Sequence, residues 1–401
     1  MLNLRNYFRF VVWVPAASLW ITATALAQQP PAPRVADLAV TDGTNLKTTY
    51  FSAGKPGPGI LLLHQCNRQR KVWDGLAQRL AAAGFNVLTL DFRGFGESGG
   101  KTADKLSGQE YFSVIKDKFP GDVDAAFGYL VSQPGVTRDA IGAGGASCGV
   151  HQSVQLARRH PEVKALALLS EGTDRAGRQF LRQSPNLPLF LAVADDDQDP
   201  GVADIMQWLY GLSPNPADQF LRYPTGGHGV EMFEAHKELP GQIVEWFHAT
   251  LLPGPRSPGS AVAGVASHSS RETEFLEVLD QPDGTAKATQ KYIEARRLDP
   301  KASLFSERVM YRLALESFQA GNLKQTIEIM KLDALGYPNM PSVYDNLAFA
   351  YLAEGEKDLA RQNAKKALEL LASDTTDPED RRKAIKESAE QKLKQLGDTP
   401  K

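Results

Sequence analysis

The sequence predicts an α/β fold with a mainly parallel sheet, followed by a separate all-α region. Between residues 35 and 252, short apolar runs alternate with segments of helical periodicity, as in strands joined by crossover helices. Residues 253–270 are rich in Pro, Gly, Ala and Ser, a composition typical of linkers. Because residues 271–398 show only helical patterns, we expect an α/β domain at 35–252, a linker, and a helical domain at 271–398.

The elements of the first domain are expected in a regular order. Continuous apolar runs predict buried strands, and amphipathic segments predict helices, the last of them broken near Pro240. The expected strands lie at 59–64, 86–92, 140–146, 163–170 and 187–194, with a shorter, edge-like strand at 219–223, and the expected helices lie at 72–83, 120–132, 151–159 and 230–251.

The C-terminal region contains an internal repeat. Small residues that let paired helices approach, and aromatic residues that fill between pairs, recur with a period typical of tetratricopeptide repeats. Tyr344, Leu347, Ala348, Tyr351, Gly355, Ala360, Ala364 and Ala367 have counterparts 34 residues earlier at Met310, Leu313, Ala314, Ser317, Gly321, Thr326, Met330 and Asp333. A more degenerate copy is expected to end near Pro300, and residues 381–396 read as a polar capping helix.

The N-terminus has the features of a secretory signal. Arg5 and Arg9 precede an apolar stretch that ends in Ala25-Leu26-Ala27, an A-x-A cleavage pattern. A membrane anchor is the alternative, but Pro15 and the proline-rich residues 28–31 argue against it. We therefore expect residues 1–27 to be removed, and the mature protein to be periplasmic or secreted with no membrane span.

Composition narrows the classes of function. The net charge is −2 and hydrophobic residues make up 42% of the 401 residues, which is enough for a large core. No basic stripe is present, so we expect no nucleic-acid partner. The two cysteines, Cys66 and Cys148, form an even pair, which in an exported protein suggests a disulfide.

The strongest motif is Gly145-Ala146-Ser147-Cys148-Gly149, between an expected strand and an expected helix. A serine at the apex of such a sharp turn takes a strained backbone conformation, and only small residues two positions away on either side let strand and helix approach. The turn lifts the hydroxyl clear of the sheet and sets the next backbone N–H beside the reacting carbonyl. Ser147 is therefore the candidate nucleophile.

With this motif, residues 35–252 resemble the α/β-hydrolase family, in its compact dienelactone-hydrolase-like branch. The resemblance implies a nucleophile, an acid and a histidine in that order along the chain. The acid follows a late strand, which selects Asp197, with Asp196 as the alternative because the register is uncertain by one residue. The histidine lies in a glycine-rich loop, here Thr225 to Gly229, and is therefore His228.

The same resemblance implies an oxyanion hole made from two backbone N–H groups. One belongs to Cys148, and the other comes from the loop after the strand at 59–64. Where the family commonly has His-Gly, this chain has His64-Gln65-Cys66, so the second donor is the N–H of Cys66 or of Gln65. His64 is expected to support the loop.

Cys148 is a rival nucleophile, because some dienelactone-hydrolase-like members use cysteine at the elbow. Val150 would then lie two positions after the apex, where a β-branched residue suits the turn poorly, so Ser147 is preferred. The fold implied by the resemblance also brings Cys66 and Cys148 to one edge of the sheet. They are expected to bond there or to pack as two thiols.

We expect an open site without a large helical lid, because residues 171–184 are too few to form one. Arg68, Arg70, Lys71 and Arg93 could attract an anionic substrate, and Glu171 is a further pocket candidate. The leading hypothesis is an exported serine hydrolase of carboxylic esters, amides or lactones, needing no cofactor or metal. The alternatives are an envelope binding protein that recruits a protein or peptide through its repeats, and a serine peptidase of the same fold.

Overall fold

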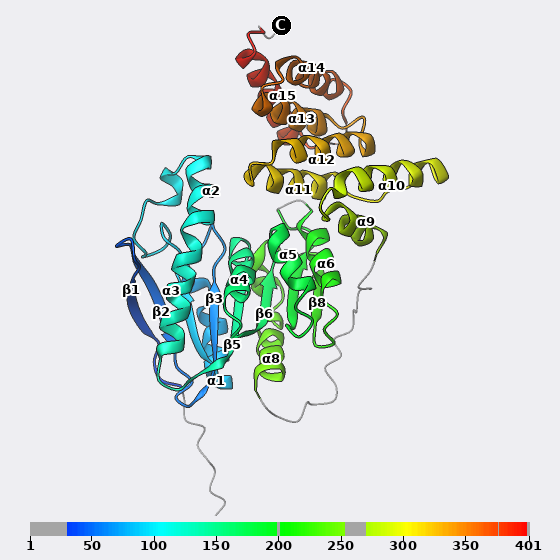
Figure 1. Ribbon diagram of the computed structural model, residues 1–401. Helices are drawn as coiled ribbons and strands as arrows, with labels where there is room; N and C mark the ends of the chain where they lie inside the picture. Colours follow the sequence, from blue (N-terminus) through cyan, green and yellow to red (C-terminus); the bar gives the residue numbers. More distant parts are fainter. Residues whose placement is uncertain (1–29, 199–200, 253–269, 376, 399–401) are drawn as a thin grey trace, which may run out of the picture.

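The computed structural model describes residues 30–198, 201–252, 270–375 and 377–398. The expected signal segment 1–27 and nearly all of the expected linker lie outside these residues. Figure 1 shows an α/β core with a stack of helices on one end of its sheet. The sheet of the described residues has the strand order β1-β2-β4-β3-β5-β6-β7-β8.

The first two strands pair antiparallel with their neighbours, and the others run parallel. The strands are β1 Arg34–Ala39, β2 Asn45–Phe51, β3 Gly57–Leu63, β4 Asn86–Leu90, β5 Val136–Ala146, β6 Val163–Leu169, β7 Leu189–Ala194 and β8 Gln219–Tyr223. The α-helices of the core are α1 Asp74–Ala83, α2 Gly108–Asp117, α3 Phe119–Ser132, α4 Cys148–Arg159, α5 Arg175–Arg182, α6 Val202–Leu212, α7 Met232–Ala235 and α8 Leu239–Leu251.

The buried strands were predictable, whereas the β1–β2 hairpin was not. β3, β4 and β7 are buried along their whole length, which is why they appear in the sequence as continuous apolar runs. β1 is mostly exposed, and its sequence, with polar residues at Arg34 and Asp37, lacks the continuous apolar run of the buried strands. The turn into β2 is formed by Gly43 at φ 82°, a conformation that favours glycine.

Each face of the sheet has its own apolar layer. Helices α1 and α8 cover one face, where Trp73, Phe85 and Phe247 are fully buried. Helices α3, α4 and α6 cover the other, and the buried cluster on that side continues into the C-terminal helices. The two layers of core helices cover the faces of the sheet and leave the ends of its parallel strands uncovered.

The chain after residue 270 is helical, as expected. Its helices are α9 Arg271–Leu279, α10 Gly284–Leu298, α11 Glu307–Gln319, α12 Leu323–Gly336, α13 Pro341–Glu354, α14 Lys357–Leu371 and α15 Glu379–Gln395. Helices α11 and α13 begin 34 residues apart, and so do α12 and α14. Gly321 and Gly355 lie at the matching turns with φ of 78° and 89°. Assignment to the tetratricopeptide class stays a prediction.

One departure from the repeat pattern has a cost that can be measured. Asp333 occupies the position held by Ala367 in the next copy and is buried, with its Oδ1 unpaired among the described residues. Burial, together with the nearby Glu307 carboxylate, raises the pKa of Asp333 to about 9. A carboxyl group with a raised folded-state pKa favours the folded state less as it ionises, so stability is expected to fall as pH rises from about 4 to about 9.

Asp333→Asn should therefore flatten the pH dependence of unfolding and raise Tm at pH 7 by roughly a few degrees, the shift that about 1 kcal/mol produces in a domain of this size. The measurement is thermal unfolding at pH 5, 7 and 9. Asp358→Asn is the control, because the side chain of Asp358 is fully exposed. Equal Tm changes in the two variants at every pH would contradict the prediction.

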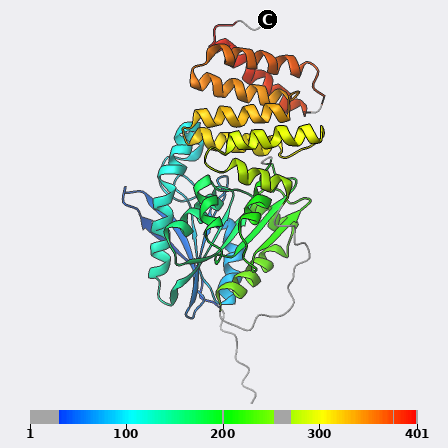
Figure 2. The same cartoon turned by 45° about the vertical axis from the view of Figure 1, so that its right-hand side comes forward.

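The C-terminal helices pack against the core at the carboxyl ends of its strands. Both views place α9 and α11 directly over α5 and α6 (Figures 1 and 2). Contacts join α6 to both α9 and α11. The helical region thus approaches the edge of the sheet at which the candidate site residues follow their strands.

Candidate active site

Ser147 lies at the apex of the turn between β5 and α4. Its φ of 51° and ψ of −125° lie in a region that non-glycine residues rarely adopt. A side chain on Gly145 would collide with the carbonyl of Gly149, and one on Gly149 with the carbonyl of Leu63. These two contacts explain the glycines of the motif, and the positive φ places the strained residue at Ser147 rather than at Cys148.

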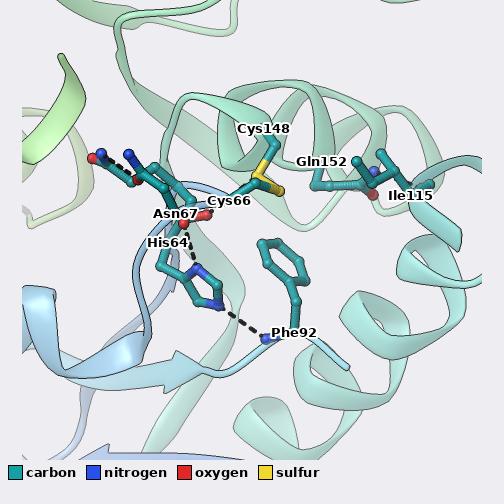
Figure 3. Close-up of a disulfide and its surroundings, with 8 residues drawn as sticks. His64, Cys66, Asn67, Phe92, Ile115, Cys148 and Gln152 are labelled. Carbon is teal, nitrogen blue, oxygen red and sulfur yellow. Dashed lines mark hydrogen bonds between the residues drawn. A yellow bond between two sulfur atoms is a disulfide. The ribbon is translucent and has the colours of Figure 1, made fainter. Parts of the chain in front are cut away.

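Cys148 is the first residue of α4, and its sulfur is bonded to Cys66 (Figure 3). The disulfide joins the loop after β3 to the first turn after Ser147, 82 residues later in the chain. The first N–H groups of a helix have no acceptor within their own helix, so the N–H of Cys148 is a natural oxyanion donor. With its sulfur in a disulfide, Cys148 offers no thiolate to compete with Ser147.

His64 supports the loop that carries Cys66. Its Nε2 accepts the N–H of Phe92 at 3.0 Å, and its Nδ1 therefore carries the proton and donates to the carbonyl of Gln65 at 2.8 Å (Figure 3). Burial lowers the pKa of His64 to about 4, which keeps the ring neutral. In a trans peptide the C=O and the following N–H point in opposite directions, so the N–H of Cys66 points away from this ring.

Asp197 and His228 are in direct contact. The Nδ1 of His228 lies 2.8 Å from one carboxylate oxygen of Asp197 and 3.0 Å from the other. The neighbouring Asp196 has a different position, because its Oδ1 accepts the N–H groups of Gly226 and Gly227 at 2.8 and 2.9 Å. Of the two candidate acids, Asp197 thus meets the ring and Asp196 holds the glycine-rich loop.

The histidine loop also lies against the elbow and the loop after β3. A Cβ added to Gly229 would be 3.3 Å from the Cβ of Ala146, the residue before Ser147. The buried side chain of Gln65 accepts the N–H of Val230 at 3.0 Å, and its amide donates to Asn67 at 2.8 Å. Gln65 therefore links the loop after β3 to the histidine loop.

Arg68 also links the loop after β3 to the histidine loop. Its guanidinium donates to Glu231 at 2.8 Å, and Glu231 accepts the backbone N–H of His228 at 3.1 Å. Sequence reasoning named Arg68 as a substrate contact and overlooked Glu231, which no motif marks. In the structure the pair joins the loop after β3 to the histidine loop.

Two of the expected surface cations are not at the surface. Arg70 is buried and pairs with Asp91 and Glu97, and the guanidinium of Arg93 is held by Asp122 and Asp42. The expectation that Arg70 and Arg93 attract a substrate is therefore wrong, because their charges are already neutralised inside the fold. Lys71 is half exposed and pairs with Glu97.

Glu171 and the expected open edge require a further correction. Residues 171–184 contain only the short helix α5, as expected, but α11 packs across these loops from the helical region. Glu171 pairs with Arg312 of α11. The sequence contained no signal for this contact, since nothing in it sets the position of α11 against the sheet.

Within the part of the chain that the structure describes, no cluster of three or more His, Cys, Asp or Glu side chains is arranged to hold a metal ion. In the same residues, no helix combines the length and the apolar character needed to cross a bilayer.

The family described as serine aminopeptidase, S33, matches residues 54–198, a segment that includes Ser147 and Asp197 and stops before His228. The core has the α/β-hydrolase fold. The order of the parallel strands, the elbow after β5 and the family match agree on this. Because the match covers less than half of the chain, it describes the α/β-hydrolase core and leaves the helices after residue 270 unclassified.

Several solved structures are similar to this chain. An esterase of Pyrococcus furiosus is 18% identical with a TM-score of 0.43, over 55% of this chain and 93% of the esterase. A dienelactone hydrolase from Anabaena variabilis is 18% identical with a TM-score of 0.42, over 56% of this chain and all of that chain. A cold-adapted esterase from an Arctic intertidal metagenomic library is 18% identical with a TM-score of 0.43, over 56% and 97%. No curated protein matches the sequence.

Proposed function

We propose that this protein is an exported serine hydrolase that cleaves carboxylic esters, with amides or lactones as further substrates. Two observations together carry the proposal. Ser147 has a strained backbone at the elbow of an α/β-hydrolase core, and His228 of the same core is hydrogen-bonded to Asp197. The serine aminopeptidase family match over residues 54–198 supports hydrolytic chemistry in general. Export rests on the sequence of residues 1–27 alone.

The proposed mechanism assigns one task to each residue. Asp197 holds the Nδ1–H of His228, which leaves Nε2 as the base that takes the proton of Ser147. The serine oxygen attacks the ester carbonyl, and the N–H groups of Cys148 and Cys66 stabilise the oxyanion of the tetrahedral intermediate. His228 then returns the proton to the leaving alcohol, and water releases the acyl group by the same steps.

Ser147→Ala is expected to abolish hydrolysis of a short p-nitrophenyl ester while the protein stays folded. Loss of the nucleophile leaves only the small rate enhancement from binding and the oxyanion hole, about 10³–10⁴-fold over water. The measurement is the steady-state rate, with circular dichroism to show that the fold is intact. An unchanged rate in the variant would refute the assignment of Ser147.

Two other functions, a serine peptidase and a binding protein, can be distinguished from an ester hydrolase by experiment. The match to a family of serine aminopeptidases favours a serine peptidase, which would cleave peptides without preference for esters. A binding protein that recruits a partner through its helical region would carry an inactive core. A fluorophosphonate probe labels an active Ser147 and leaves an inactive one unlabelled, and a panel of esters and peptides then ranks the two kinds of hydrolase.

A further inference from the structure

The turn next to the nucleophile is itself strained. Ala146 pairs with Leu169 on β6, and the N–H of Ser147 donates to the carbonyl of Leu169 at 2.9 Å. The next residue, Ser170, is fully buried and has a φ of 53°. Among the described residues only Ser147, Ser170 and Asp283 combine a side chain with positive φ, and the first two lie beside each other at neighbouring strand ends.

Such conformations are unfavourable for residues with a side chain and persist only where surrounding contacts impose them. The Ser170 turn is held on one side by the core, because its N–H donates to the carbonyl of Ala192 at 3.1 Å. On the other side Glu171 accepts the N–H of Gly172 at 2.8 Å and pairs with Arg312. One of the restraints on this turn therefore comes from helix α11, outside the α/β-hydrolase core.

Helix α11 is well placed to act as a fixed support. One turn beyond Arg312, Glu316 accepts the N–H of Arg175 at 2.7 Å and the guanidinium of Arg178 at 2.8 Å. Arg178 is buried, donates to Asp280 of the segment after α9 at 2.7 Å, and lies over the ring of Trp208. A guanidinium held by two carboxylates and an indole face leaves little freedom to the helix that it anchors.

The chain shortly after the candidate acid Asp197 also packs against helix α11. Gly201, four residues after Asp197, has a φ of 81°, and a Cβ there would lie 3.1 Å from the backbone of Arg308 and Val309. Ser306, at the start of α11, lies 3.4 Å from the carboxylate of Asp204 on α6. Helix α11 thus spans the loops after both β6 and β7, which carry the neighbour of the nucleophile and the acid.

We propose that Arg312 is a positioning residue for Ser147, acting through Glu171 and the Ser170 turn, so that the helical region forms part of the framework of the active site. The inference rests on the proposed function, because it assumes that Ser147 is the nucleophile. The side chains of Arg312 and Glu171 are only 21% and 22% exposed. Removing either one therefore leaves the other with a charge that water compensates poorly. The turn then relaxes, and with it the hydroxyl beside it.

The test compares Arg312→Gln with a matched control, Arg297→Gln, which breaks an exposed Arg–Glu pair on α10. Both variants are assayed as full chains for p-nitrophenyl acetate hydrolysis, fluorophosphonate labelling rate and Tm. We expect Arg312→Gln to lower kcat and the labelling rate by about tenfold, in the range of residues that act on a site through another residue. KM should stay nearly constant, and Arg297→Gln should match the unmodified protein.

Glu171→Gln approaches the pair from the other side and serves if Arg312→Gln does not fold. Because Arg312 acts through Glu171 in this proposal, the double variant should be no slower than the slower single variant. Arg312→Lys keeps the charge without the planar fork and should recover part of the rate.

Equal labelling rates for the unmodified protein and for a folded Arg312→Gln or Glu171→Gln variant would overturn this inference and leave the proposed function intact. A fall in Tm with unchanged kcat would do the same, since it would show a purely structural contact. Absence of labelling in the unmodified protein would overturn the proposed function, and the inference with it.

Discussion

Replacing Asp197 by asparagine is expected to lower kcat by about 10⁴-fold, the loss that follows when the acid of such a triad can no longer hold its histidine in the productive tautomer. The carboxylate lies 2.8 Å from Nδ1 of His228, and its isosteric amide can present an N–H to that nitrogen instead of an acceptor. The ring would then carry its proton on Nε2, where it cannot accept one from Ser147. The measurement is kcat for a short ester.

Asp196→Asn is the matched control, because it changes the adjacent carboxylate in the same way. Its Oδ1 accepts two backbone N–H groups of the histidine loop, and an amide oxygen can still accept them. We expect a loss far smaller than that of Asp197→Asn. A larger loss in Asp196→Asn would reverse the assignment of the acid.

Removing the disulfide should affect catalysis and stability together. In the double variant Cys66→Ala/Cys148→Ala, the loop that carries one proposed oxyanion donor is no longer bonded to the residue that carries the other proposed donor. We expect kcat to fall by about tenfold with little change in KM, short of the roughly 10²–10³-fold loss caused by removing a donor altogether. A crosslink that closes a loop of 82 residues contributes about 4.5 kcal/mol to stability in the chain-entropy model, so Tm should fall as well.

Ser147→Ala provides the stability control, since it keeps the disulfide and removes only the hydroxyl. A thiol count on unreduced, denatured protein tests the bond itself, and two free thiols would contradict it. If kcat is the same before and after reduction of the folded protein, the bond does not clamp the oxyanion hole.

The strands and the motif were predictable because they depend on residues close together in the chain. A parallel strand buried on both faces must be apolar throughout, and an elbow between β5 and α4 must have Gly145 and Gly149 two positions either side of its apex. β1 was missed because an exposed edge strand requires no such pattern. β2 is largely buried, but Lys47, Thr48 and Thr49 interrupt its apolar residues. Within the α/β core, the resemblance to α/β-hydrolases also limited the candidate acid to Asp196 or Asp197 and singled out His228 as the candidate base.

The choice between Asp196 and Asp197, and the hydrogen bonds between the surrounding loops, could come only from the tertiary structure. Asp197 rather than Asp196 meets His228 because of how the loop after β7 turns, and Gln65 reaches Val230 across more than 160 residues of chain. Arg312 lies 141 residues from Glu171 in the sequence, in a region of different architecture, and the pairing of two long side chains leaves no trace in local spacing. The sequence by itself determined the α/β core, the elbow and the candidate chemistry, because these depend on local periodicity and backbone sterics. The packing of helix α11 against the strand ends depends on buried charges brought together from distant segments, and only the fold decides it.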